Sequence, residues 1–244
     1  MEIELVNLDI YNPKDFFNDI TNNNIDNLKK QYYKNKSRFS ELIGKNIYAY
    51  KMAYELNYID MSLWLFVFLN DYEKMQEFNE ICIKGYSEIL KKYDLDNLSY
   101  YEARDAFLLA CDYGKLDIIK IFLGNHLNNL PKFQEIINDD EQNLSLNQRG
   151  FFSACKNNHI NVIKWLILND PNILHNNYIF NSNIHLYNDL FKYLSQYGNI
   201  DLIDLLIKFN DELVVFLLSD DCYNLAVKYK HIELINYLET FILF

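Results

Sequence analysis

One phrase of fourteen residues recurs along this chain of 244 residues, and it constrains the fold more than any other feature. Each copy opens on an anchor residue, usually alanine, carries an aliphatic residue six positions later, and continues with a polar residue and an apolar block. A recurring pattern of this kind indicates stacked supersecondary units rather than one central core. The copies are residues 19–32, 53–66, 110–123, 154–167, 194–207 and 226–239, with anchors Asp19, Ala53, Ala110, Ala154, Leu194 and Ala226.

The phrase carries the local signals of two helices joined by a tight turn. Gly114, Asn158 and Gly198 follow the first half of their copies, and both residue types tolerate the left-handed backbone that ends a helix. Asp117 or Asp201 then stands near the start of the next apolar run, where a helix N-terminus favours negative charge. Because one such hairpin cannot bury its apolar stripe alone, its neighbours must help to cover it. We therefore expect an all-α fold, an α-solenoid of about six helix-turn-helix repeats.

The phrase resembles the ankyrin repeat, whose pattern runs A-A-x-x-G-H-x-x-V-V-x-L-L-L. Residues 110–123, ACDYGKLDIIKIFL, follow this pattern almost position by position, and His159 and His231 stand where the family often has its histidine. The family's T-P-L-H opening is absent from every copy. The aliphatic positions recur at intervals of 34, 57, 44, 40 and 32 residues, against a family period near 33. The resemblance therefore implies divergent ankyrin-like repeats with irregular insertions.

We expect a single ankyrin-repeat-like domain over residues 1–244, with two longer segments between its repeats. Residues 71–100 are predicted to be a helical insertion, either extra helix or a degenerate hairpin that fills the gap of 57 residues. Residues 125–148 are predicted to form a polar connection. The hairpins are expected near residues 15–34, 44–70, 101–124, 149–169, 188–210 and 220–242.

The charge of the chain disfavours two classes of partner. Its 34 acidic and 23 basic residues give a net charge of −11, whereas nucleic acid and anionic membranes both select clusters of Lys and Arg. Neither partner is expected. The longest apolar runs, residues 63–69 and 213–218, are far short of a membrane span. The acidity mildly favours a basic partner, although solubility alone also explains it.

The cysteines and the first residues favour a reducing compartment. Four cysteines form no C-x-x-C pair, and we interpret them as small buried core residues. The opening MEIELVNLDI is acidic and lacks the apolar stretch of a secretory leader, so we expect a cytoplasmic protein. The richness in Asn, Ile and Lys is similar to that of divergent ankyrin proteins of giant viruses, amoebae and intracellular bacteria. This resemblance extends the expectation to the cytosol of a host cell.

No motif for catalysis or cofactor binding occurs in the sequence. The chain lacks the strings G-x-x-x-x-G-K-[ST], G-x-G-x-x-G, G-x-S-x-G and H-E-x-x-H. His159 and His231 stand at predicted turns, where the ankyrin family's histidine makes local hydrogen bonds. No spacing of His, Cys, Asp and Glu supplies three or four converging metal ligands. We therefore predict that the protein is not an enzyme and holds no cofactor and no metal.

The resemblance implies a partner-binding position in each repeat. In the ankyrin family the two residues after the anchor pair face the concave groove and often contact the partner. Three of the ten residues at these positions are tyrosine, where 20 tyrosines in 244 residues predict about one. Tyrosine is favoured at binding hot spots, although it is also common in this chain and can simply end helices. The ten residues are Glu55, Leu56, Asp112, Tyr113, Lys156, Asn157, Gln196, Tyr197, Lys228 and Tyr229.

Three functions remain open at this point. The leading hypothesis is a non-enzymatic protein-protein interaction module, a monomer that binds a partner protein through the concave face and could act as a host-directed effector. The first alternative is an effector enzyme with active residues in segments 71–100 or 125–148, which a pocket with converging polar groups and shifted pKa values would favour. The second is an acidic inhibitor that masks a basic surface, which strong salt dependence of binding would favour.

Overall fold

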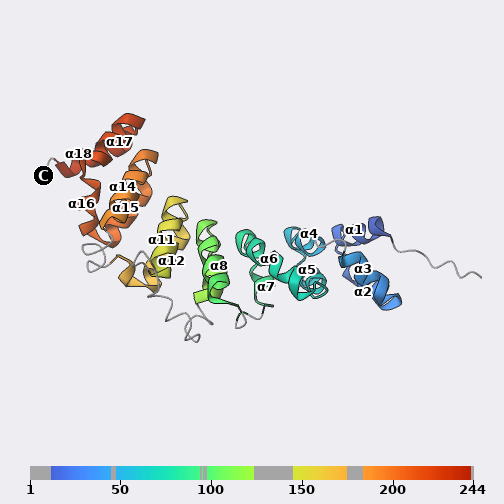
Figure 1. Ribbon diagram of the computed structural model, residues 1–244. Helices are drawn as coiled ribbons and strands as arrows, with labels where there is room; N and C mark the ends of the chain where they lie inside the picture. The colour runs from blue at the N-terminus through green and yellow to red at the C-terminus, as the bar shows by residue number, and fades with distance from the viewer. Residues whose placement is uncertain are drawn as a thin grey trace, which may run out of the picture. The chain divides into compact units, whose positions relative to one another are not determined.

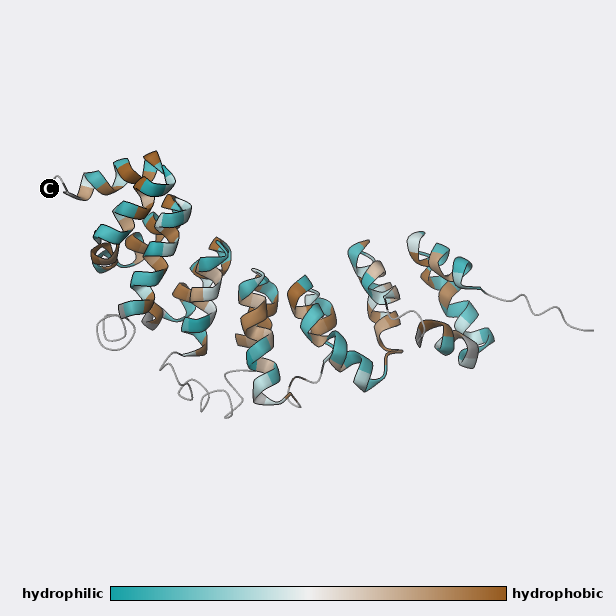
Figure 2. Ribbon diagram, turned by 45° about the horizontal axis from the view of Figure 1, so that its top comes forward, coloured by the Kyte–Doolittle hydropathy of each residue, from teal (hydrophilic) through white to brown (hydrophobic). Residues whose placement is uncertain are grey.

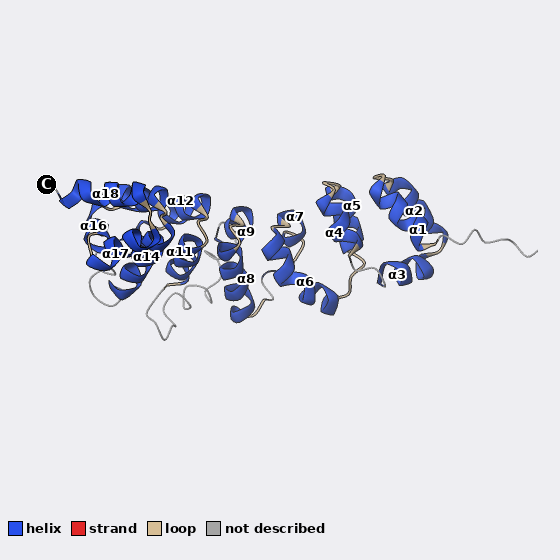
Figure 3. Cartoon of the chain, turned by 90° about the horizontal axis from the view of Figure 1, so that it is seen from above, coloured by secondary structure: helices blue, strands red, loops and turns tan. Residues whose placement is uncertain are grey.

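The computed structural model describes residues 12–44, 48–93, 95, 98–123, 145–174 and 184–242. Within these ranges the regular elements are sixteen α-helices and short 3₁₀ turns, and none of the described residues forms a strand (Figure 1, Figure 3). The predicted all-α class is therefore confirmed. In Figure 2, hydrophobic and hydrophilic residues are mixed along single helices, as expected where each helix buries one stripe.

The contacts of the chain group it into two compact units. Unit 1 comprises Met1–Ile81 and Tyr86–Tyr93, and unit 2 comprises Cys82–Gly85 and Asp94–Phe244. The single domain over residues 1–244 stays a prediction.

Unit 1 consists of helices that pair along the chain. Helix α1 packs on α2, α4 packs on α5, and α5 also contacts α7, while α1 and α4 are in contact with each other. Helix α3 follows α2 directly and was not predicted. The helices are α1 (Pro13–Thr21), α2 (Ile25–Lys34), α3 (Lys36–Gly44), α4 (Ala49–Glu55), α5 (Ile59–Phe66), α6 (Asp71–Lys84) and α7 (Ser87–Leu90), of which α6 ends in unit 2.

An aromatic cluster fills the space between α2, α3 and α5 in unit 1. The rings of Tyr32, Phe39, Trp64 and Phe68 contact one another with centroids 5.1 to 6.2 Å apart. Phe39 is buried and Trp64 is half-buried. Edge-to-face pairs at these distances stabilise a core beyond their buried area, so Trp64 acts as a core residue.

Unit 2 contains four hairpins whose first helices contact one another in chain order. Helix α8 packs on α11, α11 on α14, and α14 on α17, and each also contacts its own second helix (Figure 1). The first helices are α8 (Tyr100–Asp112), α11 (Leu146–Lys156), α14 (Ile184–Tyr197) and α17 (Asp220–Tyr229). The second helices are α9 (Leu116–Ile121), α12 (Ile160–Asn169), α15 (Ile200–Phe209) and α18 (Ile232–Ile242). Between them lie η3 (Pro171–Leu174), η4 (Asp211–Leu213) and α16 (Val214–Leu217).

Small side chains allow the first helices to approach closely. Ala110 and Ala154 are completely buried, as are Cys111 and Cys155 beside them. A β-carbon on Gly150 would lie 2.7 Å from the Cys111 sulfur atom, so the contact between α11 and α8 requires glycine there. Close packing of this kind explains why the anchor of the repeated phrase is usually alanine.

Two hairpins of unit 2 begin earlier than predicted, because capping residues precede their first helices. Ser99 and Glu102 form a capping box before α8, and Ser145 and Gln148 form another before α11. In each capping box, the serine side chain accepts a hydrogen bond from the backbone N–H of the third helical residue. The side chain of that third residue in turn accepts a hydrogen bond from the backbone N–H of the serine. Helix α11 therefore begins at Leu146 rather than near residue 149.

Seven turns share one geometry in the part of the chain that the structure describes. All seven residues with positive φ, between 54° and 83°, stand four positions after an anchor. In every turn the next residue donates its N–H to the anchor carbonyl at 2.7 to 3.0 Å. The seventh anchor is Ile81, so segment 71–100 holds a hairpin of its own, α6 and α7. The turn residues are Asn23, Asn57, Gly85, Gly114, Asn158, Gly198 and Lys230.

Candidate interaction surface

At three of the seven turns, the side chain of the following residue bonds to a backbone carbonyl group of the preceding hairpin. The Nε2 atom of His159 lies 2.7 Å from the carbonyl oxygen of Asp112, and that of His231 lies 2.8 Å from the carbonyl oxygen of Gln196. A carbonyl oxygen only accepts, so Nε2 carries the proton and donates in both cases. Tyr58 occupies the same position in unit 1, with its hydroxyl 3.4 Å from the carbonyl oxygen of Thr21. These bonds occupy carbonyl groups that the end of a helix leaves without a partner.

Glycine at two turns makes room for the histidine rings. A β-carbon on Gly114 would lie 2.5 Å from Nδ1 of His159, and one on Gly198 would lie 2.4 Å from Nδ1 of His231. Both distances are far below van der Waals contact. The hairpin of α14 and α15 carries the smaller Asn199 after its turn. The turn of the hairpin before it, α11 and α12, has Asn158 in place of glycine. At these two boundaries the histidine ring and the glycine turn that it covers are therefore matched.

The ten predicted binding residues all lie at the C-terminal ends of first helices. Glu55 and Leu56 end α4 in unit 1, and the other eight end α8, α11, α14 and α17 in unit 2. Nine of the ten are exposed and Gln196 is half-buried. We call this set the turn-end residues. The structure gives them the accessibility that a binding surface needs, and their role stays a prediction.

Three tyrosine rings are the largest apolar groups among the turn-end residues. Tyr197 is 61 % exposed, Tyr113 is 48 % exposed and Tyr229 is 44 % exposed. The Tyr197 ring lies against Tyr193, with centroids 4.6 Å apart, and Lys228 places its ammonium group 5.3 Å from the centre of the Tyr229 ring. Neighbouring side chains thus restrict the Tyr197 and Tyr229 rings before any partner binds, which lowers the entropy lost on binding.

Some turn-end residues also hold neighbouring hairpins together, a role that the sequence did not indicate. The Asp112 carboxylate accepts hydrogen bonds from the Ser153 hydroxyl at 2.7 Å and from the Asn157 amide at 2.8 Å. Glu55 accepts a bond from the Tyr86 hydroxyl at 2.9 Å. Tyr193, which no sequence signal singled out, donates to the carbonyl oxygen of Lys156 at 3.0 Å.

A buried group of charged residues joins α4 to α6 within unit 1. Lys51 is 6 % exposed and Glu77 is 9 % exposed, and the ammonium group of Lys51 lies 2.5 Å from the Glu77 carboxylate and 2.6 Å from that of Glu80. The hydroxyl of Tyr50 donates to Glu77 at 2.7 Å. Each charged group therefore has a partner, as a buried charge requires.

The pKa shifts in this group do not suit catalysis. Burial acts to lower the pKa of Lys51, but its hydrogen bonds to Glu77 and Glu80 outweigh burial and the net pKa is raised. Burial and the bond to Glu77 raise the pKa of Tyr50. A lysine that acts as a base or nucleophile needs a lowered pKa, because only the neutral amine reacts. The group therefore has the properties of a structural link between two helices.

Metal binding and reactive thiols find no support in the described ranges. No group of three His, Cys, Asp or Glu side chains there could hold a metal ion. Burial raises the pKa of the Cys82 thiol to about 12, and Cys111, Cys155 and Cys222 are buried as well. None of the described helices is both long and apolar enough to cross a membrane. Most of the predicted connection 125–148 lies outside the described residues.

Comparison with known proteins gives no further guide to function. No protein-family model, curated protein or solved structure matches this chain.

Proposed function

We propose that this protein is a non-enzymatic module that binds a partner protein, built as an α-solenoid of divergent ankyrin-like repeats. The partner would contact the turn-end residues of successive first helices. The observation that carries this proposal is the exposure of Tyr113, Tyr197 and Tyr229 at equivalent positions of their hairpins. The repeat places each ring at the same point of its hairpin, and none of the three tyrosines is among the buried residues of the core.

The packing behind the rings supports a rigid binding surface. His159 and His231 fix the backbone at the ends of α8 and α14 through their bonds to carbonyl oxygens at 2.7 and 2.8 Å. A partner would therefore meet side chains on a backbone that is already ordered, and little rearrangement on binding is expected. We place the module in the cytoplasm, where a host cell is one setting, and expect it to act as a monomer.

The mutation of the three tyrosines tests this proposal. Hot-spot rings each contribute more than about 1 kcal/mol, so replacing all three with alanine should weaken Kd for the partner roughly a hundredfold. The partner is first captured on the immobilised protein and identified by mass spectrometry, and Kd is then measured with the two purified proteins. The melting temperature should remain unchanged, because the rings are exposed.

A matched control uses three tyrosines that are exposed elsewhere. Tyr33, Tyr72 and Tyr101 are 72 %, 72 % and 63 % exposed, and none is a turn-end residue. Their triple alanine variant should bind as the unaltered protein does. If both triple variants bind with the same Kd as the unaltered protein, the turn-end residues are not the binding surface. If binding instead disappears at 0.5 M salt with either variant, the masking of a basic surface becomes the better account.

A further inference from the structure

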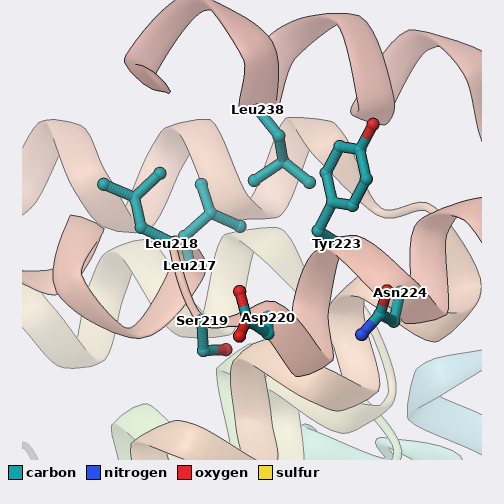
Figure 4. A pocket seen from close by; sticks show the side chains of 7 residues that line it. All are labelled: Leu217, Leu218, Ser219, Asp220, Tyr223, Asn224 and Leu238. Atoms are coloured by element: carbon teal, nitrogen blue, oxygen red, sulfur yellow. The ribbon is translucent and has the colours of Figure 1, made fainter.

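A small cavity opens at the N-terminal end of α17 in unit 2. Its volume is about 200 Å³, and α16, α17 and α18 contribute its walls. The turn-end residues of α17 lie at the opposite end of the same helix, so this cavity is a separate feature. The residues that line it are Leu217, Leu218, Ser219, Asp220, Tyr223, Asn224 and Leu238 (Figure 4).

The cavity has apolar walls and one exposed acidic group. Leu217 and Leu238 are buried, Leu218 is 41 % exposed, and Figure 4 shows the Tyr223 ring beside Leu238 with the Asp220 carboxylate below them. The Tyr223 hydroxyl donates to Glu239 at 3.2 Å, and this bond holds the ring as a wall.

Asp220 has no side-chain hydrogen bond or ion pair to any described residue, in contrast to its neighbour. Asp221 is paired with Lys192 of α14 at 2.6 Å. The lining residues include no lysine, arginine or histidine. The nearby carboxylates of Asp220 and Glu239 carry two full negative charges, which exceed the partial positive charge of about one half at the N-terminus of α17, so the cavity favours a cation.

The size of the cavity favours one side chain over a free ligand. Sites for drug-sized molecules occupy roughly 300 to 1,000 Å³, whereas this cavity has about 200 Å³. A long basic side chain has the matching character, because its methylene stem lies along apolar walls while its charged head remains at a polar rim. Arginine fits better than lysine, since its planar group stacks on an aromatic ring and pairs with a carboxylate through two parallel hydrogen bonds.

We propose that this cavity binds an arginine side chain of a partner protein, with its stem between Leu218 and Leu238, its guanidinium group on the Asp220 carboxylate and the Tyr223 ring beside it. This inference extends the proposed function by naming one side chain of the partner. It involves none of the turn-end residues, so either proposal can fail while the other stands.

The test uses leucine methyl groups as reporters in the full-length protein. N-acetyl-arginine methylamide is titrated into protein labelled with ¹³C at leucine methyls, and the spectra are followed by NMR. We expect saturable shifts at Leu217, Leu218 and Leu238 with a Kd of the order of 1 mM, which is typical for so small a ligand. The citrulline analogue has the same shape without charge and should bind at least about tenfold more weakly.

Variants separate this site from a general attraction of cations to an acidic protein. Asp220→Asn and Leu218→Gln should each weaken the arginine probe at least about fivefold, since one removes the charge and the other removes an apolar wall. The matched control is Asp201→Asn, because Asp201 is also an exposed carboxylate in the first turn of a helix. It should leave the titration unchanged, and circular dichroism melting checks that each variant folds.

Three results would overturn the proposal. The first is the absence of saturable shifts at the three leucines up to 50 mM arginine probe. The second is an equal response to the citrulline analogue or to N-acetyl-lysine methylamide. The third is an equal loss of affinity for the arginine probe in Asp201→Asn and in Asp220→Asn, which would show only a general effect of charge.

Discussion

Replacing Gly114 with alanine should disturb the boundary between two hairpins of unit 2. Gly114 has φ of +67°, and an L-residue in this region costs roughly 1 kcal/mol. The new β-carbon would lie 2.5 Å from the His159 ring, which would have to move and lose its bond to the Asp112 carbonyl oxygen. That bond contributes about 1 kcal/mol. The total destabilisation should be about 2 kcal/mol, measured by urea unfolding with the slope m unchanged.

Gly85 provides the matched control for this prediction. Its φ is +83°, but the three atoms nearest to an added β-carbon all belong to the flexible Lys115 side chain, the first at 3.0 Å. Gly85→Ala should therefore cost only the backbone term of roughly 1 kcal/mol. In the double variant with His159→Ala, the ring is gone, so Gly114→Ala should also cost only about 1 kcal/mol. If Gly114→Ala costs no more than Gly85→Ala, or if the two changes at 114 and 159 simply add, the ring is not matched to the turn.

Three further predictions follow from buried charges and helix caps. Lys51→Met leaves the Glu77 carboxylate buried without its cation and should destabilise by about 3 kcal/mol in urea unfolding, whereas Lys91→Met at an exposed pair should cost less than about 1 kcal/mol. Equal costs would contradict this. Folding raises the pKa of Lys51 and of Tyr50 above the unfolded values of about 10.5 and 10, so both groups hold their protons more tightly in the folded state. Their contribution to stability is complete at pH values below these unfolded pKa values, and stability should fall as the pH rises above about 10. This fall should be smaller in Lys51→Met than in the unaltered protein, and an equal fall would contradict it. Ser145→Ala removes the cap of α11 and should lower the stability by about 1 kcal/mol, while an unchanged melting temperature would show that the cap is dispensable.

Features set by neighbouring residues could be predicted from the sequence. Gly114, Asn158 and Gly198 mark turns because glycine and asparagine accept positive φ, and all three have it in the structure. The ends of the first helices could be located from the repeated phrase for the same reason. The all-α class follows from the same local signals.

The sequence could not decide between extra helix and a degenerate hairpin for residues 71–100, because the phrase that begins at Ile81 departs from the repeated pattern. Its anchor is isoleucine rather than alanine, and Ser87 stands where the other copies carry an aliphatic residue. Only the backbone shows the shared geometry, through the bond from the Tyr86 N–H to the Ile81 carbonyl at 3.0 Å. A turn geometry can therefore persist after the side-chain pattern has gone.

Contacts between residues far apart in the sequence could not be predicted. Lys51 and Glu77 lie on different helices, so no spacing of three or four residues connects them. The same holds for Asp112, which looked like a binding residue and also receives bonds from Ser153 and Asn157 of the next hairpin. The cavity at α17 depends on Leu238, which only the packing of α18 brings to Asp220.

Hydrogen exchange of the complex with the captured partner tests the central claim most directly. The account predicts slower amide exchange at the ends of the first helices in unit 2, at residues 112–114, 156–158, 196–198 and 228–230. Slower exchange that is confined to other segments, such as α6 or the connection before α11, would show that the partner binds elsewhere and would contradict the account.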